Sequence, residues 1–406
     1  MSFKFEPPFD AIIYLEKDQI DLDTFKQISK IIEDPVIKKP RFMPDVHPGT
    51  GCCVGFTSEL TDKIIPRIIG PDIGCGVLTY CLVNCKFKTG KYEKKFDDII
   101  KKVIPMGNGH DKVHVEPIIQ ECQYVGFFAA AQETAKKFAE RYKDQFGIDI
   151  LGKMPLYSSE WLKDNLCKKV SSDYEYDLRS MGTLGGSNHF IEVGEEGDNL
   201  YFTVHTGSRN IGSKICRYHQ DKMDNSKISY LTGDAAYEYY FDMIFAQMYA
   251  KMNRKAIMSH MFLHLNINFD LKEENIIESV HNYIDFEDMI IRKGAIPARK
   301  DQKCIIALNM RDGIIVCKGK GNVDWNYSAA HGCGRIVTRN KAKRQFTLKK
   351  YKEAMRNVYS TSVNMGTIDE APMAYKDSEM IITYLGPTVE IMCQVKPTLN
   401  VKGMTA

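Results

Sequence analysis

The stretch that decides the fold and chemistry of this chain is Gly70-Pro71-Asp72-Ile73-Gly74-Cys75-Gly76-Val77. Asp72 and Cys75 stand three residues apart among glycines, which allow the backbone a positive φ and a close approach to a bound group. A soft thiolate beside a hard carboxylate suits a borderline divalent cation such as zinc or manganese. The competing interpretation is a tight turn with a buried cysteine, and the octapeptide alone favours it.

Short strands and a loop are predicted on either side of this turn. Ile64–Ile69 leads into it, and residues 77–83 leave it as a strand. Upstream, the stretch 44–51 contains two prolines and two glycines, which predict a fixed loop that presents Asp45 and His47. Fixed loops of this kind are common places for functional residues.

Histidines recur beside glycine-rich turns further along the chain. His189 lies between Leu184-Gly185-Gly186-Ser187-Asn188 and a β-like run, and His205 follows the predicted strand Tyr201–Val204. Arg209 lies in the small-residue loop after His205, where an arginine and backbone N–H groups can bind phosphate. His281 opens a new segment, and a fourth glycine-framed histidine is His331 in Ser328-Ala329-Ala330-His331-Gly332-Cys333-Gly334-Arg335.

Composition limits the class of protein. The chain has 406 residues, 44% of them hydrophobic, and a net charge of only +3, so any surface for nucleic acid must be local. The 12 cysteines include no Cys-x-x-Cys pair, and the first residues contain no apolar signal segment, so we expect a reducing, cytoplasmic location. No run approaches 18 apolar residues, so no membrane span is predicted.

Helices are predicted for most of residues 93–180 and, as one helix or two, for residues 234–265. The only dense basic run follows His331, and it could neutralise a nucleic-acid backbone or form a solvated helix face. It contains Arg339, Lys341, Lys343, Arg344, Lys349, Lys350 and Lys352. Short mixed strands between long helices indicate an α+β fold. Candidate site residues run from Asp45 to Lys402, which predicts one catalytic domain over residues 1–406.

The residues alone predict a two-metal enzyme that acts on phosphate groups. The ligand set would be Asp72, Cys75, His189, His205 and His281. His331 could be a further ligand, a general acid or base, or a nucleophile that forms a phosphoramidate. No Gly-x-x-x-x-Gly-Lys-[Ser/Thr] motif is present, so a nucleotide would not be held by a P-loop.

Five blocks in order resemble the signatures of the RtcB family of RNA ligases. They are Asp-Val-His-Pro-Gly at 45–49, Asp-Ile-Gly-Cys-Gly at 72–76, Gly-Thr-Leu-Gly-Gly-Ser-Asn-His-Phe-Ile-Glu at 182–192, His-Thr-Gly-Ser-Arg at 205–209 and His-Gly-Cys-Gly-Arg at 331–335. Ala-Tyr-Lys-Asp at 374–377 and the terminal Lys-Gly at 402–403 also match. The resemblance covers essentially the entire chain and implies a single body of mixed and antiparallel sheets with surrounding helices.

The resemblance implies a GTP- and manganese-dependent ligase. It would join RNA ending in a 2′,3′-cyclic phosphate or 3′-phosphate to RNA with a 5′-hydroxyl, in RNA repair or tRNA splicing. His331 would take GMP from GTP and pass it to the RNA 3′-phosphate, giving RNA-(3′)pp(5′)G, and the 5′-hydroxyl would then displace GMP. Asp45 would orient or deprotonate His331. A small activator called archease assists many family members.

The resemblance also implies ligand sets. One manganese would be held by Cys75, His205 and His281, and the other by Asp72, Cys75 and His189, with Cys75 bridging. The nucleotide and its phosphates would contact Asn188, Glu192, Arg209, Arg335, Tyr375 and Lys402.

The chain departs from the family pattern near the predicted nucleophile. Ala307-Leu308-Asn309-Met310-Arg311-Asp312-Gly313 replaces a frequent Pro-Gly-Ser-Met-Gly block. Ser328-Ala329-Ala330 replaces the more usual Ser-x-Ser before the histidine, and Cys333 replaces alanine. We interpret the chain as a divergent member. A second hypothesis is a two-metal phosphoesterase acting on RNA ends, and a third is a non-catalytic RNA-binding subunit, which loss of ligand residues would favour.

Overall fold

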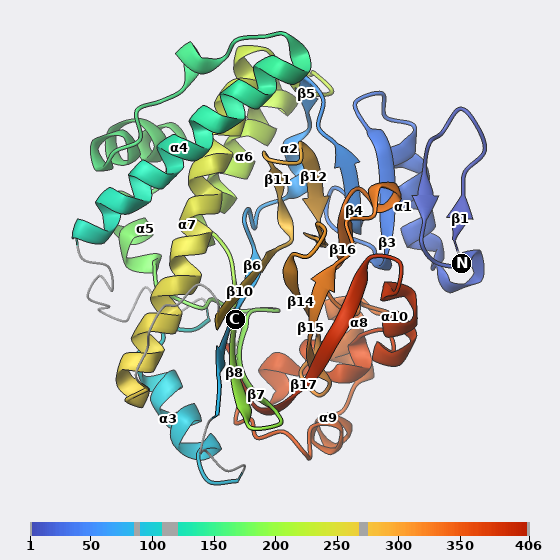
Figure 1. Cartoon of the computed structure of the whole chain (residues 1–406), viewed down its shortest axis with the longest axis vertical. Coiled ribbons are helices and arrows are strands. Elements are labelled where there is room, and N and C mark those ends of the chain that lie inside the picture. The colour runs from blue at the N-terminus through green and yellow to red at the C-terminus, as the bar shows by residue number, and fades with distance from the viewer. Residues whose placement is uncertain (1, 85–89, 108–120, 268–274, 404–406) are drawn as a thin grey trace.

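The structure is a computed structural model that describes residues 2–84, 90–107, 121–267 and 275–403. These residues form a mixed α+β body in which two large sheets are flanked by helices, which confirms the predicted fold class (Figure 1). Every strand pair in the two large sheets is antiparallel except β2 with β3.

The first large sheet has the strand order β1 (Phe3–Lys4), β2 (Ile12–Ile13), β3 (Lys38–His47), β4 (Val54–Glu59), β12 (Ile290–Lys293) and β11 (Asn282–Asp285). The second has the order β10 (Ile276–Val280), β6 (Gly76–Leu82), β8 (Asn199–Thr206), β7 (Phe190–Glu196), β17 (Val389–Lys402), β15 (Gly313–Gly319) and β14 (Lys303–Asn309). Two short pairs complete the strands: β13 (Ala295–Pro297) with β16 (Ser328–Ala330), and β5 (Lys63–Ile64) with β9 (Leu231–Thr232).

The α-helices of the described residues are α1 (Leu22–Ile32), α2 (Pro66–Ile69), α3 (Glu93–Val103), α4 (Glu121–Phe146), α5 (Tyr174–Ser180), α6 (Arg209–Asn225), α7 (Asp234–Leu265), α8 (Arg339–Gln345), α9 (Leu348–Ala354) and α10 (Ser378–Leu385). The short helical turns are η1 (Lys17–Gln19), η3 (Leu151–Lys153), η4 (Trp161–Cys167), η6 (Val323–Trp325), η7 (Met365–Glu370) and η8 (Pro372–Ala374). No helix of these residues is both long and apolar enough to cross a membrane.

The segment 234–265 is one helix, α7, and it is buried along much of its length because apolar residues occupy all of its faces. It packs against α4, α6 and α3 and against β8 of the second sheet. Tyr239, Tyr240 and Phe245 on α7 are completely buried in the largest apolar cluster of the molecule. The aromatic side chains of this part of α7 are therefore core. Further along the helix, Met261 and Phe262 share a second apolar cluster with Val204 of β8, which supports the second sheet.

The second large sheet curls until its two edge strands meet. The backbone N–H of Ile305 on β14 donates a 2.8 Å hydrogen bond to Ser279 Oγ on β10. The curled face encloses an apolar cluster that includes Val77, Ile314 and Val395. Curling brings β14 next to β10 and to β6, the strand that follows the Asp72–Cys75 turn.

Antiparallel pairing places the histidines at one end of this sheet. β6 begins at Gly76, directly after Cys75, and Gly76 pairs with Thr206 at the end of β8 and with Val280 at the end of β10. Phe190, the first residue of β7, pairs with His205. Cys75, His189, His205 and His281 all lie at strand ends that meet, so residues separated by up to 206 positions become neighbours.

The prediction of a loop over residues 44–51 is wrong for its first half. Residues 44–47 belong to β3, and the loop begins at Pro48. The pairing of β3 with β4 is irregular between Phe42 and His47, which accommodates Pro44, a residue that has no N–H to donate to a regular ladder. Asp45 is therefore fixed by a strand, which holds a side chain more firmly than a loop does.

Candidate active site

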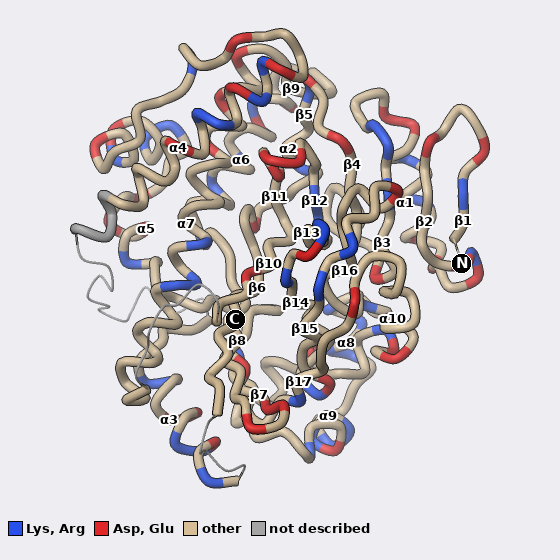
Figure 2. Tube along the Cα trace, in the orientation of Figure 1, with Lys and Arg blue, Asp and Glu red and all other residues tan. Residues whose placement is uncertain are grey.

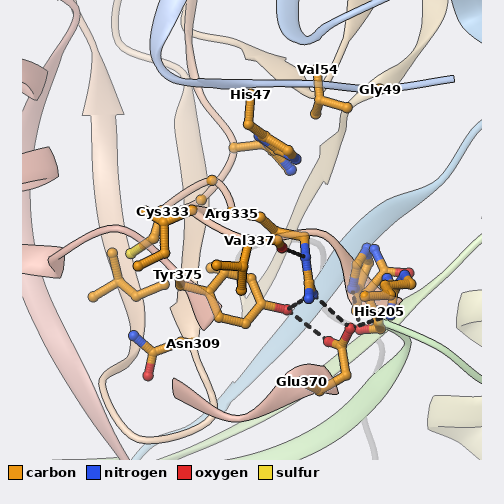
Figure 3. A pocket seen from close by; sticks show the side chains of 18 of the residues that line it. His47, Gly49, Val54, His205, Asn309, Cys333, Arg335, Val337, Glu370 and Tyr375 are labelled. Carbon is orange, nitrogen blue, oxygen red and sulfur yellow. Dashed lines mark hydrogen bonds and ion pairs between the residues drawn. The ribbon is translucent and has the colours of Figure 1, made fainter. Parts of the chain in front are cut away.

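A cavity of about 850 Å³ opens where the ends of the two sheets meet (Figure 3). Its walls come from segments that lie far apart in the sequence: the loop after β3, the ends of β8 and β14, the segment 331–341 and the last residues of β17. His205, His281 and His331 line it, as do Asn188, Glu192, Arg335, Tyr375 and Lys402. A volume of this size admits a nucleotide-sized ligand.

Asp45 holds the imidazole of His331 at the cavity wall. Asp45 Oδ2 lies 2.6 Å from His331 Nδ1 and also accepts hydrogen bonds from the backbone N–H groups of His331 (3.1 Å) and Gly332 (3.2 Å). Asp45 is completely buried, whereas the His331 side chain keeps 19% of its surface exposed. With Nδ1 held by the carboxylate, Nε2 of His331 is the nitrogen left to react.

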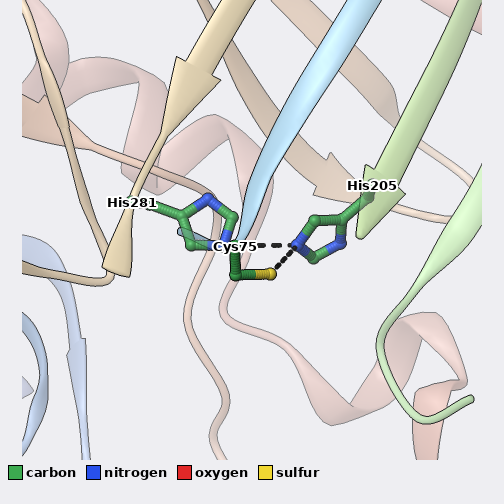
Figure 4. A group of neighbouring side chains, drawn as sticks. All are labelled: Cys75, His205 and His281. Carbon is green, nitrogen blue, oxygen red and sulfur yellow. Dashed lines mark hydrogen bonds between the residues drawn. The ribbon is translucent and has the colours of Figure 1, made fainter. Parts of the chain in front are cut away.

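Cys75, His205 and His281 form one cluster of possible metal ligands (Figure 4). Cys75 Sγ lies 3.3 Å from His205 Nε2, which lies 3.2 Å from His281 Nε2. The three side chains are buried. The His281 ring is 4.8 Å from the His331 ring, so the cluster adjoins the Asp45–His331 pair.

A second cluster shares the thiol of Cys75 and adds Asp72 and His189. His189 Nε2 lies 3.0 Å from Asp72 Oδ2 and 3.6 Å from Cys75 Sγ. Burial raises the pKa of Asp72, but the neighbouring His189 and the Cys75 thiol outweigh it, so the pKa lies well below its usual value. A carboxylate, a thiol and an imidazole therefore converge on one point.

Backbone carbonyls select the histidine tautomer that a metal ligand needs. His189 Nδ1 lies 2.9 Å from Leu184 O, and His205 Nδ1 lies 3.2 Å from Asn188 O, so both Nδ1 atoms carry the proton and both Nε2 atoms present lone pairs to the clusters. Burial and nearby histidines lower the pKa of His205 and of His281 well below 6.5, which keeps these rings neutral. Burial and Asp72 raise the pKa of Cys75.

Glu370 joins the other wall of the cavity into one ion network. Its Oε1 lies 3.1 Å from Arg335 Nη1 and also contacts Arg339, and its Oε2 accepts from Tyr375 OH (2.7 Å) and Lys402 Nζ (3.1 Å) (Figure 3). Burial alone would raise the pKa of Glu370, but the cations around it hold that pKa well below its usual value. One buried carboxylate thus positions four cavity side chains.

Glu192 and Asn400 form a polar pair at the same wall. Asn400 Nδ2 donates a 2.8 Å hydrogen bond to Glu192 Oε2, and both side chains are at most 3% exposed. Burial raises the pKa of Glu192 to about 8, although the Asn400 hydrogen bond and the Lys402 charge partly oppose the shift. The pair offers hydrogen-bond acceptors to a ligand whose edge carries N–H groups.

Comparison with known proteins decides the family. A family profile described as "tRNA-splicing ligase RtcB" matches residues 27–403. The chain belongs to the RtcB family. This membership confirms the family suggested by the five sequence blocks and makes RNA ligation, in splicing or repair, the class of reaction.

Curated RtcB proteins match along nearly their full length. The chain is 28% identical to RNA-splicing ligase RtcB1 of Escherichia coli, with 95% of each chain covered, and 26% identical to RNA-splicing ligase RtcB of Escherichia coli K12, with the same coverage. It is 26% identical to tRNA-splicing ligase RtcB of Methanococcus maripaludis, with 96% of this chain and 94% of the relative covered.

Most residues singled out in the sequence come together in this RtcB-family structure. Arg209 is the exception among the predicted nucleotide contacts, because it lies behind the cavity wall, with Nη1 3.4 Å from His189 Nδ1 and Nε 3.3 Å from Thr183 Oγ1. Sequence reasoning missed Glu370 and Asn400. Glu370 lies just before the Ala-Tyr-Lys-Asp block at 374–377, but no residue near it in the sequence indicates its ion partners. Asn400 is two residues from Lys402 in an ordinary strand pattern.

Proposed function

We propose that this chain is a GTP- and manganese-dependent RNA ligase that joins 2′,3′-cyclic phosphate or 3′-phosphate ends to 5′-hydroxyl ends. The observation that carries the proposal is the Asp45–His331 pair at the wall of a nucleotide-sized cavity, next to two clusters of metal ligands that share one thiol. Residues from Asp45 to Lys402 contribute, so we further propose that residues 1–406 act as one ligase domain.

The donor set fits a pair of divalent cations. In each cluster the candidate ligand atoms lie within 4.8 Å of one another, and the Nε2 lone pairs of His189 and His205 point at them. A thiol whose pKa is raised by burial and by Asp72 loses its proton only if a cation offsets both effects. Cys75, His205 and His281 would hold one ion, and Asp72, Cys75 and His189 the other. Bound cations would supply charge neutralisation to phosphate oxygens during displacement.

His331 is proposed as the nucleophile. Its Nε2 would attack the α-phosphorus of GTP, so that an N–P bond forms while the P–O bond to pyrophosphate breaks. Asp45 keeps the proton on Nδ1 and stabilises the positive charge that develops on the ring, because its carboxylate is 2.6 Å away and excluded from water. A 2′,3′-cyclic phosphate would first be opened by water, which breaks the bond between phosphorus and O2′ and leaves a 3′-phosphate. An oxygen of the RNA 3′-phosphate would then take GMP from His331, and the 5′-hydroxyl would finally displace GMP.

The guanine base is proposed to lie against Glu192, Tyr375 and Lys402. Guanine presents two N–H donors and one oxygen acceptor, which match the ionised form of Glu192 and the Lys402 ammonium, so binding of the base would lower the pKa of Glu192. Asn188 and Arg335 would contact the phosphates from the cavity wall. Arg209 would act through His189, against which its guanidinium lies.

Ligation of defined RNA ends tests the proposal. The purified protein with manganese and GTP should join an RNA with a 2′,3′-cyclic phosphate to one with a 5′-hydroxyl, and ATP should not replace GTP. Trimmed ends without joined product would instead favour a two-metal phosphoesterase. Addition of an archease-type activator to the same reaction tests whether this partner is needed.

A further inference from the structure

We propose that the exposed basic face of α8 and α9, which we call the α8–α9 surface, binds the RNA backbone beside the joining site. The surface comprises Lys341, Lys343, Arg344, Lys349, Lys350, Lys352 and Arg356, all of them exposed. This proposal rests on the proposed function for the identity of the ligand as RNA. It adds where the RNA chain lies once it leaves the cavity.

Positive charge is more concentrated in the α8–α9 segment than in the rest of the chain. Residues 339–356 contain eight basic side chains and one acidic side chain, a net charge of +7, whereas the entire chain carries only +3. The remainder of the chain is therefore net negative. Figure 2 shows basic residues on α8 and α9 at the side of the molecule away from α4. A local field of this sign attracts a polyanion.

The cations of this surface are not used to hold the fold. Arg339 makes ion pairs with Asp369 and Glu370, but in the part of the chain that the structure describes, the seven exposed cations form no ion pair with a carboxylate. The helices are anchored instead by apolar residues: Ala342 on α8 and Tyr351 on α9 are completely buried, and Met355 is 3% exposed. The lysines are therefore free to contact a ligand.

The surface begins in the wall of the cavity. Arg339, Asn340 and Lys341, at the start of α8, line it, and Tyr351 of α9 packs against Met310, which also lines it. Each seven-residue helix is about 10 Å long, so the pair extends well past a single nucleotide bound at His331. An RNA whose end lies in the cavity has its next phosphates within reach of these lysines.

The test compares two variants that each lose four positive charges. One is K343A/R344A/K349A/K350A on the α8–α9 surface, which leaves the cavity-lining Lys341 unchanged. The matched control is K136A/K137A/K163A/K168A, which removes four exposed lysines from α4, from η4 and from the residue after η4, on the other side of the molecule. Binding of a 30-nucleotide single-stranded RNA is measured by fluorescence anisotropy at 50–200 mM salt, and GMP transfer from GTP is measured without RNA.

Seven phosphate contacts would give a slope of log affinity against log salt of about −5, and three remaining contacts about −2. Between 50 and 200 mM salt, wild-type affinity should then fall about a thousandfold and that of the surface variant only about twentyfold. We expect the control to follow the wild type and all three proteins to accept GMP at equal rates.

Equal RNA affinity and salt slope in the surface variant and the control would overturn the proposal. So would wild-type protein that binds anionic phospholipid vesicles but no RNA. A wild type that binds RNA through this surface yet neither accepts GMP nor joins ends would contradict the proposed function and leave the surface assigned to RNA.

Discussion

Replacing Asp45 by asparagine tests the link between geometry and chemistry at His331. The asparagine Oδ1 can still accept from the backbone N–H groups of His331 and Gly332, which now lie 3.1 and 3.2 Å from the carboxylate. Because Oδ2 of Asp45 makes these contacts and also lies 2.6 Å from His331 Nδ1, the amide oxygen in its place would still face the ring, and Nδ2 would replace Oδ1. The substitution therefore keeps the ring orientation and removes the negative charge that stabilises the imidazolium.

The expected loss follows from burial. Asp45 is completely buried, and loss of one charged member of a buried ion pair costs about 3–5 kcal/mol. The Asp45 charge stabilises the His331 ring in the transition state of GMP transfer, where the ring becomes positively charged. Loss of this energy should therefore slow GMP transfer by roughly 10²- to 10⁴-fold. Unfolding free energy should change by only about 1 kcal/mol, because the backbone contacts remain.

Single-turnover transfer of α-³²P-GMP to the protein measures this loss. The matched control is Asp23→Asn, which removes an exposed carboxylate from the rim of the same cavity. If D45N accepts GMP within threefold of the wild-type rate while D23N does the same, the role of the Asp45 charge beside His331 is refuted.

Three further predictions concern the cations and the nucleotide. Cys75→Ser should lower bound manganese from two ions to at most one, and Cys81→Ser on β6, the strand that follows Cys75, should not. Two ions in C75S by elemental analysis would exclude the shared thiol. Glu370→Gln should leave Lys402, Arg335 and Arg339 without their buried counter-charge. It should therefore lower the free energy of unfolding by about 3–5 kcal/mol in denaturant unfolding and raise KM for GTP more than it lowers kcat. The control Glu379→Gln, at an exposed position, should change neither stability nor KM. The pKa of Glu192 is about 8 in the folded protein and 4.5 in the unfolded chain. Between these two values the folded state keeps a proton that the unfolded state loses, so wild-type stability falls as pH rises from 4.5 to 8. Glu192→Gln should therefore be more stable than wild type at pH 8, equal to it near pH 4, and weaker in GTP binding; lower stability at pH 8 would contradict the burial argument.

Local patterns predict the parts of the site that lie next to glycine-rich turns. The Asp72–Cys75 turn, the strand after it and the histidines beside β7 and β8 follow from hydrophobic runs and their boundaries. Such patterns identify where a strand ends, and in an antiparallel sheet neighbouring ends meet. The register Gly76–Thr206 and Phe190–His205 explains why these predictions succeed together.

Long-range partners explain what the sequence does not reveal. Asn400 contacts Glu192 across 208 positions, and Glu370 contacts Lys402 through a turn whose shape depends on the packing of η7 and η8. No spacing rule connects such residues. The extension of β3 to His47 was missed for a related reason, because its prolines are tolerated only through an irregular pairing with β4.

Incubation of the purified protein with manganese and α-³²P-GTP, followed by a denaturing gel, tests most directly whether His331 carries GMP. We expect a protein-bound label that is lost in acid, survives hydroxylamine and is absent from His331→Ala, while that variant still binds two metal ions. A label that persists in His331→Ala, or no label at all in metal-loaded wild-type protein, would contradict this expectation.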